Sequence, residues 1–159
     1  MCCSSGIYFS PNDNRNQAFC PPSDLQSNQA VEIIAIYKAA SAVLKFIPLR
    51  IVTDSLYAIN GLTQHLSTWK DNGWISIKNA MLFQLTASIL KQHMAPTTFQ
   101  WVKGHLNTIS NEEADCLAKE GANKSTLDAL HLNIQKEFDL QGAKLATITQ
   151  SLAYRGIYK

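Results

Sequence analysis

Three acidic residues interrupt segments that are otherwise apolar enough to pack into a protein interior. Glu32 lies in SNQAVEIIAIYKA, Asp54 in RIVTDSLYAINGL, and Asp115 in WVKGHLNTISNEEADCLAKEGA. Two carboxylates about 4 Å apart repel by roughly 4 kcal/mol at an effective dielectric constant near 20. A fold that gathered all three at one place would need cations there. The pattern therefore predicts a divalent-metal site.

The composition predicts one compact domain with a hydrophobic core and a tail. The chain has 159 residues, of which 46% are hydrophobic, and no apolar run approaches the roughly 20 residues that span a bilayer. The N-terminus has no basic-then-apolar signal segment, so secretion is not expected. The cysteines lack the spaced pairs of a zinc site, and we expect reduced thiols and a cytoplasmic or nuclear location. These are Cys2, Cys3, Cys20 and Cys116. A net charge of +2 does not indicate a broad basic surface, so composition alone does not predict which kind of partner the protein binds.

Hydrophobic periodicity and turn residues predict a mixed α/β order in which helices cover a sheet. The expected strands are residues 6–9, 17–20, 49–53 and 97–102, and the expected helices are residues 27–45, 55–66, 77–93 and 110–121. Ser110 and Glu113 match an S-x-x-E capping box at the start of the last helix. The WKDNGW run at residues 69–74 is expected to be a loop with aromatic anchors.

The signal weakens after residue 123. We expect residues 1–123 to form the domain and residues 124–159 to form a linker and a short helical tail. Leu145, Ile148 and Leu152 recur at i, i+3 and i+7, which predicts an amphipathic helix. That helix either packs back on the domain or docks on a partner.

Three motifs together resemble ribonuclease H of type 1, including the copies found in retroelement polyproteins. They are T-D-S-x-Y at residues 53–57, K-x-x-G-W at residues 70–74, and G-H with N-E-E-A-D-x-L-A between residues 104 and 118. The resemblance covers roughly residues 6–122. It implies a ribonuclease H-like mixed sheet flanked by helices and endonucleolytic cleavage of the RNA strand of RNA–DNA hybrids. It also implies two Mg²⁺ (or Mn²⁺) ions held by four carboxylates, and no membrane.

The resemblance assigns roles to individual residues. Glu32, Asp54 and Asp115 match catalytic metal ligands, and His105 matches a loop histidine that assists proton transfer or product release. The substrate-binding positions are Asn28 and Gln29, which match a pair that reads the minor groove of the hybrid, and Ser55 and Asn79, which match contacts to the nucleic-acid backbone. A protein distinguishes RNA from DNA by sensing the 2′-hydroxyl from that groove.

Each residue also has a plainer interpretation. Asp115 could pair with Lys119 at i, i+4, and Asp54 with Ser55 could cap a helix. His105 could be an ordinary loop residue, and the four substrate-binding positions hold residue types that are common at caps and turns. Glu32 is the hardest to explain as surface, because its helix is apolar almost all round.

One departure from the family lies at the front of the chain. The family begins with a central strand that carries its first catalytic aspartate, whereas only MCCSS precedes Gly6 here. Five residues reach at most about 17 Å, which is too short for that strand and its turn. Asp13 and Asp24 lie in turn-like surroundings and are not expected to replace it. We therefore expect the N-terminal central strand to be missing and the chain as it stands to have little or no hydrolytic activity. The alternative is a non-catalytic nucleic-acid-binding domain or a degenerate retroelement-derived one.

Overall fold

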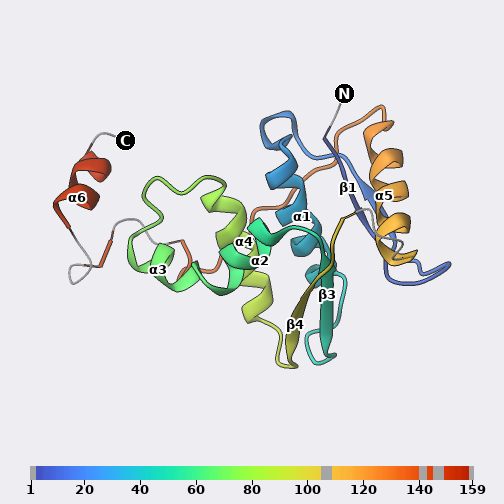
Figure 1. Ribbon diagram of the computed structural model, residues 1–159, viewed down its shortest axis with the longest axis horizontal. Helices are drawn as coiled ribbons and strands as arrows, with labels where there is room; N and C mark the ends of the chain where they lie inside the picture. The colour runs from blue at the N-terminus through green and yellow to red at the C-terminus, as the bar shows by residue number, and fades with distance from the viewer. Residues whose placement is uncertain (1–2, 105–108, 140–142, 145–148, 158–159) are drawn as a thin grey trace.

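The computed structural model describes residues 3–104, 109–139, 143–144 and 149–157. Short strands and helices alternate along the chain as a mixed α/β fold (Figure 1). In order, they are β1 (Ser5–Ile7), β2 (Gln17–Phe19), the 3₁₀ turn η1 (Ser23–Leu25), α1 (Asn28–Ser41), β3 (Leu49–Thr53), α2 (Leu56–Thr63), α3 (Leu66–Asp71), α4 (Ala80–Lys91), β4 (Thr97–Trp101), α5 (Ile109–Ala122) and α6 (Gln150–Ile157). Across these ranges no helix combines the length and the apolar character needed to cross a bilayer.

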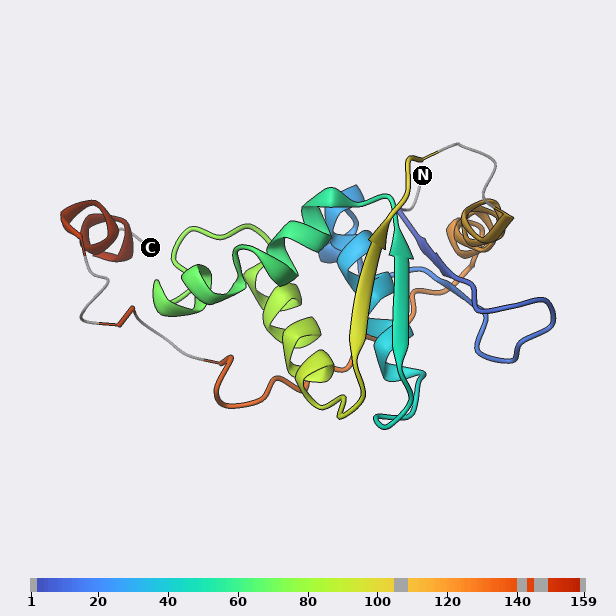
Figure 2. The same ribbon diagram turned by 60° about the horizontal axis from the view of Figure 1, so that its bottom comes forward.

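The strands form two separate two-stranded sheets. β1 and β2 are antiparallel, with Ser5 opposite Phe19, and β3 and β4 are parallel, with Leu49 opposite Thr97. Figure 2 shows β3 and β4 side by side. Among the described residues no strand lies between β1 and β3. The expected α/β fold class, a mixed sheet flanked by helices, is confirmed. The strands are divided between two small sheets.

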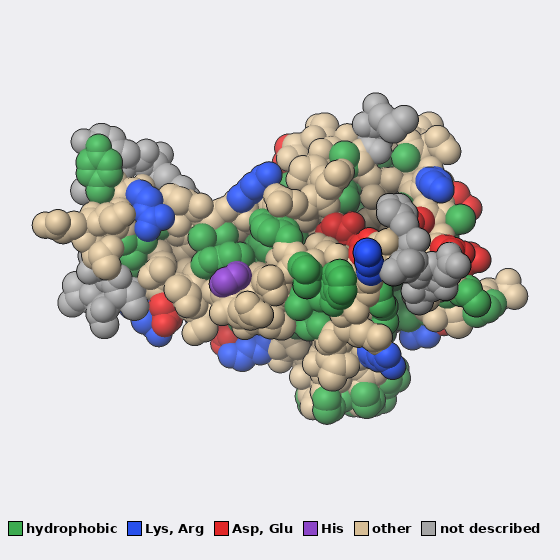
Figure 3. Space-filling model, in the orientation of Figure 1, with side chains coloured by type: hydrophobic (Ala, Val, Ile, Leu, Met, Phe, Trp, Pro, Cys, Tyr) green, Lys and Arg blue, Asp and Glu red, His purple; other side chains and the backbone are tan. Residues whose placement is uncertain are grey.

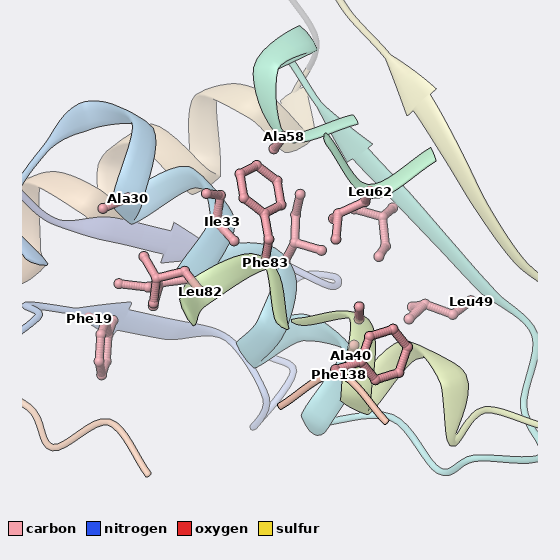
Figure 4. Packing of buried hydrophobic residues seen from close by; sticks show 14 of the residues in the cluster. Phe19, Ala30, Ile33, Ala40, Leu49, Ala58, Leu62, Leu82, Phe83 and Phe138 are labelled. Atoms are coloured by element: carbon pink, nitrogen blue, oxygen red, sulfur yellow. The ribbon is translucent and has the colours of Figure 1, made fainter. Parts of the chain in front are cut away.

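The hydrophobic core lies among α1, α2, α4 and the inner face of β3. Helix α1 begins because Ser27 caps it, its Oγ accepting the Ala30 N–H at 3.2 Å. Its apolar residues then pack against α4, and Phe83 of α4 is fully buried between α1 and α2 (Figure 4). Alternation along β3 turns Leu49 and Ile51 inward. This core fixes the helix and the strand that carry two of the three acidic residues.

The WKDNGW run is not a loop throughout, so that prediction is wrong for its first residues. Helix α3 covers Leu66–Asp71 and includes Trp69. The Trp69 ring stacks on His65 and meets Phe83 edge-on, with centroids 5.3 and 5.0 Å apart. Trp74 is buried nearby. Packing of these aromatic rings on the core stabilises a helical turn. The polar residues of the run had indicated a loop instead.

The capping box at Ser110 and Glu113 is also wrong, because α5 begins at Ile109 and both residues lie within the helix. Side chains three apart are neighbours on a helix surface anywhere along it, so the S-x-x-E spacing does not by itself mark a helix start. The helix ends at Ala122, one residue beyond the expected position.

The chain beyond α5 runs back along the domain before α6. Two hydrogen bonds join Asp128 to Cys20: the Cys20 N–H donates to Asp128 Oδ2 at 2.8 Å, and the Asp128 N–H donates to the Cys20 carbonyl at 2.7 Å. Further on, the Gln135 N–H donates to Ser88 Oγ at 2.9 Å, and Phe138 is buried in the core. A helix, α6, lies in the tail and buries Leu152, whereas Leu145 and Ile148 lie outside the described residues, so the amphipathic helix expected from these three residues stays a prediction. The division of the chain at residue 123 stays a prediction.

Candidate functional site

Glu32, Asp54 and Asp115 line a single cavity of about 310 Å³. They come from three elements far apart in the sequence: Glu32 from the second turn of α1, Asp54 from the residue after β3, and Asp115 from the middle of α5. Acidic side chains gather on the surface where these elements meet (Figure 3). The fold therefore brings together the three carboxylates that the sequence singled out.

Glu32 is the electrostatically unusual member of the three. The pKa of Glu32 is raised to about 7, first by burial of its carboxyl and then by the negative charges of Asp54 and Asp115. Asp54 and Asp115 are exposed to solvent. A carboxyl that is both buried and surrounded by negative charge is the group that gains most from a bound cation.

The backbone around Asp54 is held from two sides. The Ser55 N–H donates to Thr53 Oγ1 at 3.1 Å, and Trp101 Nε1 donates to the Asp54 carbonyl at 3.0 Å. Across the site, a Cβ added at Gly104 would lie 2.7 Å from Asp54 Oδ2, so only glycine fits at this approach without a shift. Sequence reasoning missed the contributions of Trp101 and Gly104 to positioning Asp54. The glycine of the G-H motif was the available signal.

The donor set suits a hard cation, although the side chains do not enclose one. Carboxylate oxygens are the ligands that Mg²⁺ and Mn²⁺ prefer in proteins. Among the described residues, no three His, Cys, Asp or Glu side chains stand close enough together to form a complete ligand set. The site is thus three coupled carboxylates around a cavity, not a closed metal cage.

Of the four expected substrate-binding residues, two lie on α1 and two lie directly before α2 and α4. Asn28 is exposed at the first position of α1, and Gln29 is half-buried beside it. Ser55 caps α2, its Oγ accepting the Ala58 N–H at 3.2 Å. Asn79 has a left-handed backbone, with φ of 58°, and its Nδ2 donates to Tyr57 Oη at 3.3 Å.

These placements support some of the plainer interpretations of the candidate residues and not others. The capping interpretation holds for Ser55, whereas Asn79 precedes α4 without a side-chain capping bond. The ion pairs formed by the described residues do not include one between Asp115 and Lys119, so the pairing interpretation of Asp115 has no support. His105 lies outside the described residues.

Neither Asp13 nor Asp24 belongs to the site. Asp13 lies in the turn between β1 and β2, where its carboxylate accepts two hydrogen bonds from the Arg15 guanidinium, which hold its pKa at about 2. Asp24 is exposed in η1. Neither residue lines the cavity that holds Glu32.

Comparison with known proteins relates this chain to ribonucleases H. The sequence model of the family described as RNase H matches residues 4–123. The chain is 37% identical over 100 residues to a ribonuclease H of Pseudomonas paraeruginosa, covering 60% of this chain and 66% of that protein. It is 33% identical over 103 residues to a ribonuclease H of Methylobacillus flagellatus, covering 62% and 67%. It is 32% identical over 113 residues to a ribonuclease H of Parvibaculum lavamentivorans, covering 68% and 74%.

The chain thus spans 66% of the length of the first of these relatives. The family match nevertheless includes β1 to α5 and all three carboxylates of the cavity. On the motifs, the fold and this match, the chain belongs to the ribonuclease H family.

Proposed function

We propose that this protein acts on RNA–DNA hybrids through a divalent-metal centre built on Glu32, Asp54 and Asp115. The observation that carries the proposal is the convergence of these three carboxylates, from three separate elements, on one cavity. Hydrolysis of the RNA strand of a hybrid is the activity that the names of the relatives support for them. For this chain that activity remains a proposal.

The carboxylates fit Mg²⁺ or Mn²⁺ in kind, because all three are hard oxygen donors and the most buried one is destabilised by its neighbours. A divalent ion bound there would supply positive charge to the carboxylates and to a substrate phosphate. Glu32 has a pKa of about 7 without metal, so it must release a proton to become a ligand near neutral pH. Metal affinity should therefore rise with pH.

Other residues would bind and orient the hybrid. Asn28 and Gln29 open the helix that carries Glu32, so a groove contact at these residues would place the hybrid near the carboxylates. Ser55 adjoins Asp54 and caps α2, and Asn79 is linked to α2 by its hydrogen bond to Tyr57. We propose these four as substrate-binding residues and His105 as an assistant in proton transfer or product release.

No fourth carboxylate of the described residues lies beside the first three. Among the described residues that line the cavity, Glu32, Asp54 and Asp115 are the acidic ones. A two-metal centre short of one acid holds its ions less tightly. We therefore propose that the chain as it stands binds hybrids and hydrolyses them slowly or not at all. A retroelement origin and a cytoplasmic or nuclear location stay predictions.

The test uses a hybrid with a labelled RNA strand, incubated with the full chain and Mg²⁺. We expect binding that weakens steeply as salt rises, with little cleavage. The Asp54→Asn variant serves as the catalytic control, and Glu112→Asn, which removes an exposed acid of α5, as the matched one. Mg²⁺-dependent cleavage that Asp54→Asn abolishes and Glu112→Asn spares would overturn the claim of low activity. Absence of any hybrid binding at low salt would overturn the proposed function itself.

A further inference from the structure

Two hydrogen-bond donors converge on the backbone carbonyl oxygen of Asp54. The Trp101 indole Nε1 donates to it at 3.0 Å, and the N–H of Leu56, the first residue of α2, donates to it at 3.2 Å. Trp101 and Leu56 therefore lie together beside the acidic site, although they come from different elements. Both side chains are exposed, Trp101 to 47% and Leu56 to 51%. We call these two side chains the indole surface.

The packing of the domain does not account for the indole surface. Neither Trp101 nor Leu56 belongs to the hydrophobic core cluster, and neither lines the cavity of the three carboxylates. Figure 3 shows hydrophobic side chains beside acidic ones on this face of the molecule. The one polar atom of the indole already donates to Asp54, so the exposed part of the ring offers only apolar, π-electron surface. Such a ring beside a candidate site suits a flat, apolar group of a ligand.

Positive charge flanks the indole surface. Lys103 is exposed two residues after Trp101. On the other side, the Tyr57 hydroxyl, one residue after Leu56, donates to the Lys78 carbonyl at 3.2 Å, and Lys78 is exposed as well. Neither lysine takes part in the ion pairs that the described residues form. Two such cations attract a ligand that carries negative charge on either side of its flat group.

A nucleotide strand combines the two properties that the indole surface and its lysines select. Its bases are flat and have a π-face, and its phosphates are negative on both sides of each base. An apolar segment of a partner protein would fit the ring but not the flanking cations. Inside a duplex both faces of a base are covered by its neighbours, so only an unpaired base can lie on the ring. Because the indole N–H is already engaged, the contact would not depend on which base is bound.

We propose that the indole surface binds an unpaired nucleobase by stacking on Trp101, with Lys103 and Lys78 attracting the phosphates on either side. Stacking itself does not rest on the proposed function. In a protein that acts on RNA–DNA hybrids, the base belongs to a single strand that continues beyond the hybrid, and this placement does rest on it. The ligand class is thus a hybrid with a single-stranded extension.

The test compares three fluorescently labelled ligands on the full chain. They are a blunt hybrid, the same hybrid with a three-nucleotide DNA overhang, and the same hybrid with an overhang of abasic nucleotides. Affinities are measured by anisotropy at low salt with Mg²⁺, and the RNA strand is checked for cleavage after each titration. We expect the overhang to bind about tenfold more tightly than the abasic overhang, because stacking on an aromatic ring requires a base. This comparison uses the unaltered protein and so does not depend on the folding of a variant.

Variants locate the contact. Trp101→Leu removes the ring and should abolish the tenfold gain, whereas Trp101→Phe keeps a ring without the N–H and should retain part of it. Phe46→Leu removes another exposed ring, 64% exposed and before the opposite end of β3, and should retain the whole gain. Lys103→Gln leaves the hydrogen bonds to Asp54 in place and should weaken both overhangs by the same factor, with a shallower dependence on salt. Circular dichroism of each variant controls for folding.

Equal affinities for the overhang and the abasic overhang would overturn the proposal, and so would a gain that survives Trp101→Leu. If Trp101→Leu weakens the blunt hybrid as much as the overhang, the ring contacts the paired region and the proposal is wrong. A six-residue thymidine oligonucleotide separates this inference from the proposed function. Binding of that oligonucleotide that requires Trp101, in a protein that binds no hybrid, would leave the inference standing and remove the proposed function. Binding of the blunt hybrid with no gain from the overhang would do the reverse.

Discussion

The two sheets of this molecule differ in how they are supported. β3 and β4 pair over five residues each and lie against a core of fully apolar side chains from α1, α2 and α4. β1 and β2 pair over three residues each, and their main support is α5, which packs closely on both. The first half is held by burial of apolar surface, and the second by the close fit of one helix to one short hairpin. The acidic residues lie where the two halves meet. The two halves can therefore be perturbed separately.

The largest effect should come from the core of the β3–β4 half. Phe83→Ala removes a fully buried ring and should lower the free energy of unfolding by about 3–5 kcal/mol. Urea denaturation followed by circular dichroism measures this change. Met81→Ala, on the same helix and 39% exposed, is the control and should change stability by about 0.5 kcal/mol. Equal losses in the two variants would show that α4 does not carry the core.

The next effect should come from Glu32, which belongs to the site and not to the hydrophobic core. The pKa of Glu32 is about 7 in the folded protein, against an ordinary value of 4.5. The folded state therefore binds more protons than the unfolded state between pH 4.5 and 7, and stability falls as pH rises through that window. Without metal, Glu32→Gln should stabilise the protein at pH 8 by up to about 3 kcal/mol, and the difference should vanish below pH 4.5.

Chemical denaturation of both proteins in chelator, repeated across this pH range, tests the sign. Glu112→Gln, which removes an exposed acid of α5, controls for the loss of negative charge. Excess Mg²⁺ should shrink or reverse the advantage of Glu32→Gln, because only the wild type gains from binding the ion. A Glu32→Gln variant that is less stable than the wild type at pH 8 without metal would contradict the prediction.

A smaller effect should come from the β1–β2 half. A Cβ at Gly6 would lie 1.9 Å from the Ala114 carbonyl oxygen, so Gly6→Ala must push α5 away from β1. We expect a loss of about 1–3 kcal/mol, with faster amide exchange in α5 than in α4. Gly156→Ala, where the nearest atom is the end of the Ile75 side chain at 3.3 Å, is the control. Uniform acceleration in α4 and α5 would show that the two halves unfold as one unit.

The smallest effect concerns the helix that both halves share. Ser27→Ala removes the cap of α1 and should cost about 1 kcal/mol, whereas Ser27→Gly should cost only a few tenths. Thermal melts of both variants at pH 8 would separate these values. If neither substitution lowers the melting temperature, the hydroxyl does not cap the helix in solution.

Local pattern was enough to predict several elements. The strand at residues 49–53 was predicted with its observed ends, because an apolar, β-branched run lies between Pro48 and Asp54. The helix of Glu32 was predicted from its apolar run, although it ends at Ser41 and not near residue 45. The motifs likewise predicted the family, which the family match confirms. The roles of individual site residues stay predictions.

The sequence by itself determined which segments are helical or extended, which carboxylates lie in apolar surroundings, and which family the chain belongs to. Only the tertiary structure decided that β1 and β3 leave a cavity between them and that Gly104 closes on Asp54. It also decided that Trp69 lies in a helix and that burial, together with two negative charges, raises the pKa of Glu32. The physical reason is the distance along the chain over which each effect acts. Propensity and periodicity act over neighbouring residues, whereas burial, charge coupling and edge pairing depend on contacts between residues far apart in the chain.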